Sequence, residues 1–271
     1  MRTAIVQAPY PDGVKMRPSD TAEWILCKAE EIHGADLAVL PEYGNCPGDI
    51  RSRAELEGAM DNNERFLERI KRAAQKNCFN IAVNLVLRRE VGIFNTILLV
   101  GRDGKTLAAY DKAHLTSFER NTLGLSAGNG TKVVEVDGIH YGFMTCFDIY
   151  FSEYAEKLGE NFPDIVIHPS YQRSEPAKIL RAMAAGRALD LNAYIVRASY
   201  SMCIGAITGG HSMVCDPFGC ILLDAGQKTG VFYYEIDIGK KRLRPECYGG
   251  DITGGREIIE KYRRPELYRN R

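Results

Sequence analysis

Three side chains that together could attack a carbonyl-like carbon each stand where an expected β-strand ends. Cys146 comes directly after an apolar run, Glu42 follows a Leu-Pro pair that closes another apolar run, and Lys112 follows a third strand-like segment. Active sites of α/β proteins collect beyond the carboxyl ends of their strands. A thiol, a carboxylate and an ammonium gathered there would provide a nucleophile, a proton acceptor and a positive charge for a developing oxyanion.

These groups suffice to hydrolyse a carbon–nitrogen bond through an acyl-enzyme. A free thiol has a pKa of about 8.5, so Cys146 needs a base such as Glu42, and such proton transfer contributes ~10²–10⁴-fold in rate. Lys112 and the backbone N–H of Phe147 would meet the oxyanion, and losing one such donor costs about 2.7–4 kcal/mol. We therefore expect an acyl-thioester, loss of ammonia or an amine, and release of the acid by water that Glu42 activates.

The elements that must position these residues follow one order twice, and residues 36–43 recur in kind as residues 164–171. In the first half we predict strands at 3–7, from 36, at 80–87, 95–100 and 106–110, and helices at 20–33 and 63–76. In the second half we predict strands at 140–145, from 164, at 193–198, 211–215, 221–223 and 231–236, and helices at 152–158 and 175–191. Asp20 and Glu23 are expected to cap the first helix.

The repeated order predicts an α/β fold with an internal pseudo-two-fold duplication. Each β-α-β unit implies parallel strands and a right-handed crossover. Two such sheets packed face to face, with helices outside, would bring Glu42 and Cys146 to one rim. No Pro-, Ser- or Gly-rich linker separates the halves, so we expect one domain over 1–271. Its polar tail, 242–271, is expected to be irregular and to pack on the body or on a partner subunit.

Composition argues against several other classes of protein. The 271 residues carry 35 Lys and Arg and 35 Asp and Glu, so there is no basic field for nucleic acid or an anionic membrane. The start lacks the apolar core of a signal peptide, and no apolar run is long enough to span a bilayer. The eight cysteines are scattered, which favours reduced thiols over a disulfide framework. We expect a cytoplasmic protein that acts on a small molecule.

The three candidates lie in motifs that resemble the nitrilase superfamily of carbon–nitrogen hydrolases. In that family the glutamate follows Leu-Pro, the lysine stands in Tyr-x-Lys-x-His-Leu, and the cysteine precedes an aromatic residue and an acid, as Glu42, Lys112 and Cys146 do here. The likeness extends to further segments, at 4–7, 210–214, 216–219 and 264–268. It implies a four-layer α-β-β-α sandwich, a homodimer or higher homo-oligomer formed through outer helices, and no metal or other cofactor. It also implies a second glutamate that orients the lysine and the substrate, for which Glu119 is the best match.

The residues after Cys146 bear on the substrate. Nitrile hydrolysers of the family typically have Cys-Trp-Glu, whereas its amidases and carbamoylases usually have Cys-aromatic-Asp, so Phe147 and Asp148 favour a small carboxamide or an N-carbamoyl compound. A nitrile is the alternative. Many relatives place an arginine, credited with binding a substrate carboxylate, where this chain has Tyr150. That difference puts N-carbamoyl-amino-acid and ω-amidase substrates in question, unless Arg173 supplies the charge.

The substrate pocket is expected to use side chains close to the three candidates. Tyr43, Tyr171 and Gln172 follow strand ends at the expected rim, where they either contact the substrate or pack the rim. Phe147 and Tyr150, next to the nucleophile, complete the predicted substrate-binding set.

Other residues of the chain resemble sites of different chemistry. Ser126 lies in a Gly-x-Ser-x-Gly segment, which in serine hydrolases stands between a strand and a helix, but here the segment is polar and glycine-rich, so we expect no serine nucleophile. His114, His168 and His211 lack metal-ligand spacing and are expected to be core histidines. Cys146 taken alone is more typical of a buried structural thiol than of a nucleophile, and only its motif with Glu42 and Lys112 favours catalysis. A catalytically silent binding subunit is the non-enzymatic hypothesis.

Overall fold

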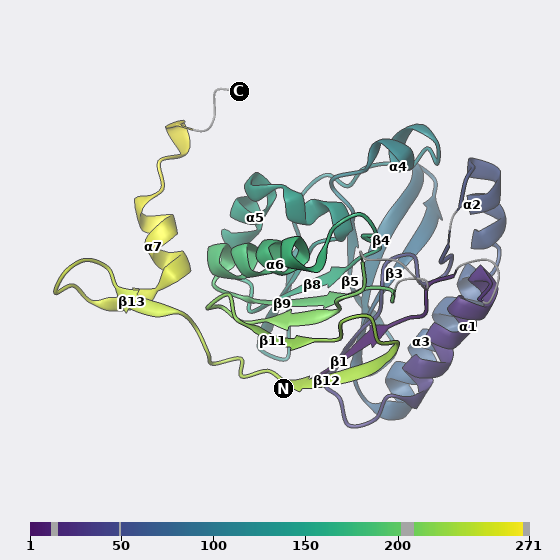
Figure 1. The fold of residues 1–271 in the computed structure, drawn as a ribbon, viewed down its shortest axis with the longest axis horizontal. Coiled ribbons are helices and arrows are strands. Elements are labelled where there is room, and N and C mark those ends of the chain that lie inside the picture. The colour runs from purple at the N-terminus through teal and green to yellow at the C-terminus, as the bar shows by residue number, and fades with distance from the viewer. Residues whose placement is uncertain (12–15, 49, 202–208, 268–271) are drawn as a thin grey trace.

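The computed structural model describes residues 1–11, 16–48, 50–201 and 209–267. Cys203 and the last residues of the predicted tail, 268–271, lie outside the described residues. Within the described ranges the strands form two six-stranded sheets and a two-stranded one (Figure 1). In the same ranges, no helix combines the length and apolarity that crossing a membrane requires.

The first sheet has the strand order β12-β1-β2-β3-β4-β5. β1, β2 and β3 are parallel, because helical crossovers connect them. β12 pairs antiparallel with β1, and β4 and β5 extend the other edge in antiparallel pairs. The strands are β1 Arg2–Gln7, β2 Leu37–Val39, β3 Asn80–Arg89, β4 Gly92–Val100, β5 Thr106–Asp111 and β12 Gly230–Glu235.

The second sheet repeats this pattern in the order β11-β10-β9-β8-β7-β6. β7, β8 and β9 are parallel, β6 pairs antiparallel with β7, and β10 and β11 extend the other edge in antiparallel pairs. The strands are β6 Val133–Val136, β7 Ile139–Phe143, β8 Ile165–Pro169, β9 Tyr194–Ala198, β10 Met213–Cys215 and β11 Ile221–Asp224. The matching strand directions confirm the predicted duplication.

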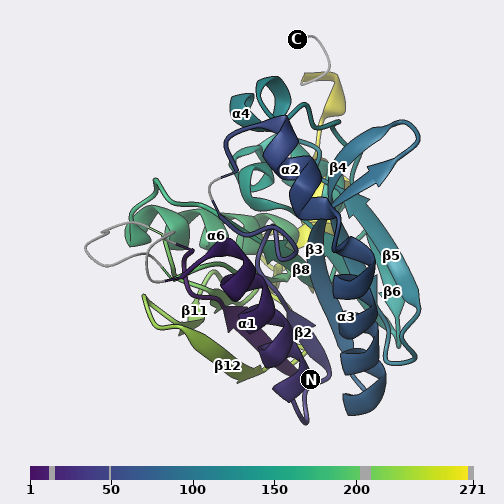
Figure 2. The ribbon, with the colours of Figure 1, turned by 90° about the vertical axis from the view of Figure 1, so that its right-hand side faces the viewer.

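Helices cover the outer face of each sheet. α1 and α3 lie against the first sheet (Figure 2), and α5 and α6 lie against the second (Figure 1). β1 contacts β9 and β2 contacts β8, and one buried apolar cluster joins Val39 and Ile97 of the first sheet to Ile167 and Val196 of the second. The predicted four-layer sandwich is therefore confirmed. The helices of these layers are α1 Pro18–Glu31, α3 Asn63–Asn77, α5 Ser152–Gly159 and α6 Ala177–Leu191, and the short 3-10 helix η1 Cys146–Tyr150 precedes α5.

Some helix boundaries differ from the predictions. α1 begins at Pro18, whose fixed φ suits the first helical position. The predicted capping pair is wrong, because Asp20 lies within the first turn and accepts a hydrogen bond from the Arg17 guanidinium at 2.8 Å. α6 begins two residues later than predicted, since Pro176 is its N-cap. Outside the tail, the elements that were not predicted include α2 Arg53–Met60, α4 Ser117–Asn121 and β6.

The tail is more ordered than predicted. It forms an antiparallel hairpin and a helix, with the bounds β13 Leu243–Pro245, β14 Ile252–Gly254, α7 Gly255–Tyr262 and η2 Pro265–Leu267 (Figure 1). Arg256 of α7 is buried and donates to the backbone oxygens of Glu156 and Asp190, which ties α7 to α5 and α6. Gly159 leaves room for this guanidinium, since a Cβ there would lie 2.5 Å from its Cζ. β13 is exposed along its length, so it has no apolar alternation from which it could be predicted.

Candidate active site

Loops after three strands bring Glu42, Lys112 and Cys146 around one cavity of about 450 Å³. Glu42 follows β2 and Lys112 follows β5 in the first sheet, where these two strands run in the same direction. Cys146 follows β7 and comes from the second sheet. The face-to-face packing of the sheets is therefore what places the thiol opposite the two charged side chains.

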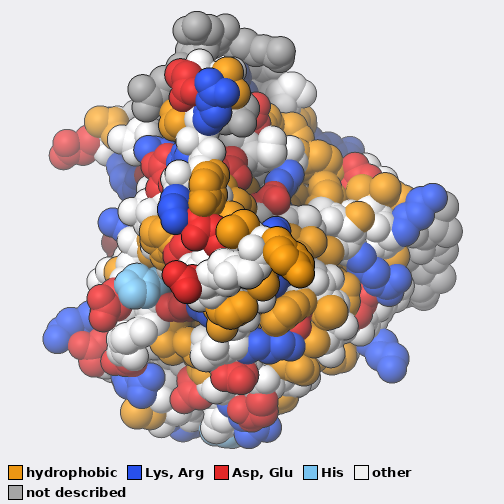
Figure 3. Space-filling view, turned by 90° about the vertical axis from the view of Figure 1, so that its left-hand side faces the viewer, with side chains coloured by type: hydrophobic (Ala, Val, Ile, Leu, Met, Phe, Trp, Pro, Cys, Tyr) orange, Lys and Arg blue, Asp and Glu red, His pale blue; other side chains and the backbone are white. Residues whose placement is uncertain are grey.

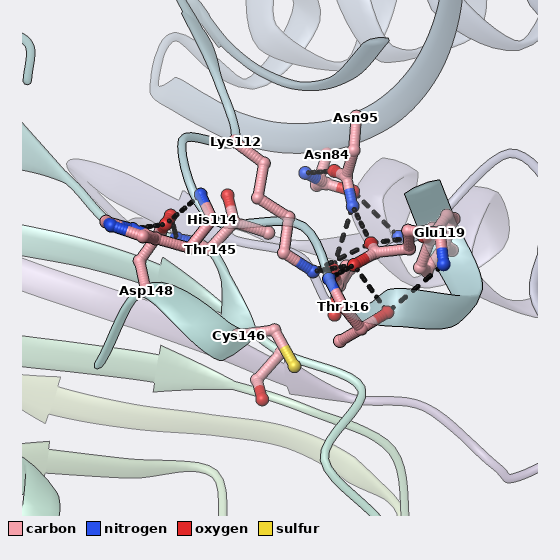
Figure 4. Close-up of polar contacts among 12 residues, drawn as sticks. Asn84, Asn95, Lys112, His114, Thr116, Glu119, Thr145, Cys146 and Asp148 are labelled. Atoms are coloured by element: carbon pink, nitrogen blue, oxygen red, sulfur yellow. Dashed lines mark hydrogen bonds and ion pairs between the residues drawn. The ribbon is translucent and has the colours of Figure 1, made fainter. Parts of the chain in front are cut away.

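Lys112 forms a buried ion-pair cluster with two carboxylates (Figure 4). Its Nζ lies 2.9 Å from Glu42 Oε1, and 2.7 and 3.0 Å from the two carboxylate oxygens of Glu119. The three side chains are at most 5% exposed. Because an unpaired buried charge costs several kcal/mol, each member of the cluster depends on the others to stay ionised.

The start of α4 fixes Glu119. Thr116 caps this helix: its hydroxyl accepts from the Glu119 N–H at 3.2 Å, while Glu119 Oε2 accepts from the Thr116 N–H at 2.8 Å. This reciprocal arrangement is a capping box. The Tyr43 hydroxyl donates to Glu119 Oε1 at 2.6 Å. The carboxylate that holds Lys112 is thus itself held by the helix backbone and by Tyr43.

Two asparagines within buried strands complete the network, and they were not predicted. Asn95 Nδ2 donates to Glu42 Oε1 at 2.8 Å and to Glu119 Oε1 at 3.3 Å. Asn84 Nδ2 donates to Asn95 Oδ1 at 2.6 Å, and Asn84 Oδ1 accepts from the Tyr43 N–H at 2.8 Å. Both asparagines are fully buried. A lone amide inside an apolar strand is a sequence signal for such a role, since a buried polar group requires partners.

Cys146 begins a tight turn that Asp148 holds in place. Its φ of 43° lies in the left-handed region, which non-glycine residues rarely adopt. Asp148 is fully buried and accepts hydrogen bonds from the Thr145 N–H at 2.8 Å, the Tyr110 hydroxyl at 2.7 Å and the His114 N–H at 2.9 Å (Figure 4). Several hydrogen bonds to one buried side chain can hold a strained backbone conformation in place, as is common at functional sites. Asp148, which in the sequence favours an amide substrate, therefore also fixes the position of the Cys146 thiol.

Burial and charge set the ionisation of these groups. Burial and the charge of Glu42 raise the pKa of the Cys146 thiol to about 12, against the opposing effect of Lys112, so the thiol is protonated at neutral pH. Burial and the charge of Glu119 raise the pKa of Glu42, against the opposing charge and hydrogen bond of Lys112. For Glu119, burial is outweighed by the charge and hydrogen bonds of Lys112, which lower its pKa. The pKa of Lys112 is raised although burial alone lowers it, because both carboxylates act on it. Lys112 is thus a permanent cation, and Glu42 is the better proton acceptor of the two carboxylates.

One oxygen of Glu42 is available for proton transfer. Oε1 receives hydrogen bonds from Lys112 and Asn95, whereas Oε2 is buried and has no hydrogen-bond partner among the described residues. A buried acceptor without a partner calls for an explanation in a folded protein. Because Glu42 and Cys146 line the same cavity, Oε2 can accept the thiol proton as sulfur attacks.

Two of the predicted substrate contacts, Tyr43 and Tyr171, line the cavity. Arg173 also lines it, with its guanidinium 5.0 Å from the centre of the Tyr171 ring. The remaining lining residues outside the ion-pair cluster are Cys46, Gly48, Ile50, Arg51, Thr116, Phe118 and Leu123. The cavity therefore has a polar end at the cluster, apolar walls and further cationic side chains.

The other predicted contacts, Phe147, Tyr150 and Gln172, are not among the residues that line this cavity, which differs from the prediction. Phe147 packs on Tyr150, with ring centres 5.2 Å apart. The Tyr150 hydroxyl donates to Glu175 at 2.6 Å, and Gln172 Oε1 accepts from the Ser170 hydroxyl at 3.1 Å. Residue spacing along the chain cannot distinguish such contacts beside the nucleophile from contacts inside the pocket.

The structure also bears on the alternative sites. Ser126 lies within 122–132, which follows a helix and precedes a strand, the reverse of the order that a serine nucleophile elbow needs. Among the described residues, no three His, Cys, Asp or Glu side chains come together as metal ligands. His114 and His211 are partly exposed and each contacts an aspartate, whereas His168 is fully buried.

A family model described as carbon-nitrogen hydrolase matches residues 2–244. The chain belongs to this family. Carbon–nitrogen hydrolases to which it is similar include 2-oxoglutaramate amidase of Bacillus subtilis, 26% identical over 231 residues, covering 82% of this chain and 86% of that protein. They also include an omega-amidase of Danio rerio, which is 26% identical over 260 residues, covering 90% of this chain and 88% of that protein.

Solved structures of carbon–nitrogen hydrolases share the fold. The amidase from Nesterenkonia sp. AN1 superposes with a TM-score of 0.75 at 20% identity, covering 100% of this chain and 99% of that chain. In that amidase structure, acrylamide is added to the active-site cysteine. A family protein of Xanthomonas campestris has an arsenic adduct in its active site. It superposes with a TM-score of 0.72 at 22% identity, covering 88% of this chain and 90% of that chain.

Proposed function

We propose that this carbon–nitrogen hydrolase cleaves the amide bond of a small carboxamide or N-carbamoyl compound through an acyl-enzyme on Cys146. One observation carries the proposal. A single cavity is lined by a protonated thiol, a carboxylate whose Oε2 has no partner among the described residues, and a permanent ammonium. The relatives named as amidases support it.

In the acylation step, Cys146 Sγ bonds to the carbonyl carbon while Glu42 accepts the thiol proton. The carbonyl electron pair moves onto oxygen, where Lys112 and the Phe147 N–H stabilise the negative charge. Collapse of the tetrahedral intermediate breaks the carbon–nitrogen bond, and Glu42 returns its proton to the departing nitrogen. Glu119 holds Lys112 in position throughout.

In the deacylation step, water attacks the thioester carbon while Glu42 accepts one of its protons. The second tetrahedral intermediate expels the sulfur, which regains that proton, and the acid leaves. Glu42 thus acts as base and acid in each half of the cycle. This alternation suits a carboxylate whose pKa is raised by burial.

A substrate panel on the purified chain tests the reaction. We expect ammonia from small carboxamides or N-carbamoyl compounds, and little from the matching nitriles. Ammonia is measured enzymatically, with Cys146→Ala as the blank. Turnover of nitriles in preference to every amide would overturn the choice of substrate class, and turnover of neither would favour a silent binding subunit.

We also propose that Arg173 binds an acidic group at the end of the substrate remote from the amide. Tyr150, which replaces the arginine of many relatives, bonds to Glu175 and is not among the lining residues, whereas Arg173 lines the cavity. The charge of Lys112 is already balanced by its two carboxylates, so a substrate anion needs another cation.

Replacing Arg173 by glutamine is therefore expected to raise KM for a carboxylate-bearing amide by ~10–100-fold, the effect of one lost charged hydrogen bond, with kcat nearly unchanged. Steady-state kinetics with a neutral amide of equal length is the comparison, and KM should change little there. Arg120→Gln, outside the cavity lining, is the matched control. An equal effect on both substrates, or a larger effect from Arg51→Gln, would contradict the assignment.

We further propose that residues 1–271 act as one domain and that the chain works as a homo-oligomer in the cytoplasm. Seen from the side of α7 and the hairpin, apolar side chains lie among charged ones (Figure 3). The exposed apolar side chains of the tail are Leu243, Tyr248, Ile252, Tyr262 and Leu267. The described cysteines are free thiols, as a reducing compartment favours. A 30.2 kDa species in analytical ultracentrifugation at micromolar concentration would contradict the oligomer.

A further inference from the structure

A buried arginine lies in the second sheet without a carboxylate partner among the described residues. Arg197 of β9 is 1% exposed. Its Nη1 donates to the backbone oxygens of Gly210 and His211 at 2.6 and 2.9 Å. Its Nη2 lies 3.2 Å from the Ser170 hydroxyl and 3.4 Å from Gln172 Oε1. All these acceptors are neutral, and burying a cation without a counter-ion costs several kcal/mol, so a compensating function is expected.

His168 connects this arginine to the nucleophile. The two residues are direct neighbours in the parallel register of β8 and β9. His168 Nε2 lies 3.3 Å from the carbonyl oxygen of Cys146. Burial and the charge of Arg197 lower the pKa of His168 to about 3, so the ring is neutral and its Nε2–H donates to that oxygen. His168 therefore brings no charge of its own, and Arg197 is the nearby cation in the second sheet.

The buried carboxylates around Cys146 disfavour further negative charge there, and a second cation would offset this effect. Glu42 and Glu119 share Lys112, and Asp148 is bonded to N–H and hydroxyl groups (Figure 4). Asp224 of β11 contacts a histidine and a different arginine. Negative charge that develops on the sulfur or on the oxyanion would add to this excess of buried anions. Burial lowers the pKa of Arg197 to about 10, against the charges of Cys146, Asp224 and Glu42, so Arg197 is a cation at neutral pH.

We propose that Arg197 is a positioning residue whose uncompensated charge favours the anionic states that form at Cys146. The inference rests on the proposed role of Cys146 as nucleophile. Lys112 acts on the thiol from the first sheet and Arg197 from the second, so developing negative charge has a cation in each sheet. Arg197 also holds Ser170 and Gln172 directly after β8. The purely structural alternative is that these hydrogen bonds are its only role.

Alkylation of Cys146 by iodoacetamide separates the two roles, and it needs no substrate. Arg197→Gln removes the charge and Arg197→Lys keeps it, while both variants lose the planar guanidinium. Rates are measured between pH 7 and 9 by mass spectrometry of the peptide that carries Cys146. The peptide that carries the exposed Cys247 serves as the internal control.

We expect Arg197→Gln to slow alkylation of Cys146 by ~10-fold at each pH, the effect of about one pKa unit on the thiol, and Arg197→Lys to stay within ~2-fold of wild type. An unchanged rate in Arg197→Gln, or an equal fall in both variants, would overturn the proposal. If Arg197→Gln does not fold, Arg197→Lys decides alone: a rate within ~2-fold supports the charge and a ~10-fold fall refutes it. Failure of the proposed function would appear separately, as wild type that alkylates but releases no ammonia.

Discussion

Replacing Cys146 with alanine is expected to lower ammonia release from the preferred amide by at least ~10⁴-fold, because loss of a nucleophile removes the covalent path altogether. The fold should survive, since Asp148 holds the turn through the backbone N–H groups of Thr145 and His114 and through the Tyr110 hydroxyl. Ammonia release at saturating substrate, together with a thermal melt, measures both effects.

Cys46 provides a matched control within the same cavity. This second thiol lines the cavity but is 4% exposed, and burial and the charge of Glu42 raise its pKa. Unlike the thiol of Cys146, it has no buried ammonium that acts to lower its pKa. Cys46→Ala should therefore retain activity within ~3-fold, since it removes a small side chain and one weak hydrogen bond from the thiol to Asn45 Oδ1. Loss of activity in Cys46→Ala with retention in Cys146→Ala would reverse the assignment of the nucleophile.

Replacing Lys112 with methionine is expected to cost both stability and activity. The substitution leaves Glu42 and Glu119 buried without their shared cation, and breaking a buried ion pair by removing one partner costs about 3–5 kcal/mol. It also removes an oxyanion donor, so kcat should fall by ~10²–10³-fold. Urea unfolding at pH 7 and steady-state kinetics measure the two losses. Lys105→Met is the matched control, because the Lys105 side chain is 81% exposed.

The loss of stability in Lys112→Met should depend on pH. In wild type the pKa of Glu119 is lowered, so its contribution to stability is present above its unfolded pKa of about 4.3 and is lost as the pH falls. Without the lysine, burial raises the pKa of both carboxylates, and protonation neutralises them already at mildly acidic pH. The variant should therefore approach wild-type stability as the pH falls from 7 to 5. A destabilisation that is constant over this range would contradict the account of the cluster.

The strand-end positions of Glu42 and Cys146 were predictable because each follows a run of buried residues, whereas Lys112 follows β5, which is partly exposed and was recognised by its strand-like sequence. Strands such as β8 and β9, which are buried along their whole length, leave that pattern in the sequence. The capping of α4 also left a readable signal, since Thr-x-x-Glu precedes it. The same type of signal, with Ser52 as N-cap, preceded the unpredicted α2.

The rest of the site depends on contacts between strands far apart in the sequence. Asn95 contacts Glu42 only because β3 and β4 pair in one register, and Arg197 is linked to Cys146 only through His168 of the neighbouring β8. Periodicity along a single segment carries no information on such pairings. The hairpin of the tail was missed for a different reason: short exposed strands bury no apolar face that could set a pattern.

Intact-mass spectrometry of the protein quenched during turnover tests the central claim most directly. An acyl-enzyme adds the mass of the substrate minus that of the departing ammonia or amine. We expect this adduct on wild type, mapped to the peptide that contains Cys146, and its absence from Cys146→Ala. An adduct on Cys46 or Ser126, or full turnover by Cys146→Ala, would contradict the mechanism.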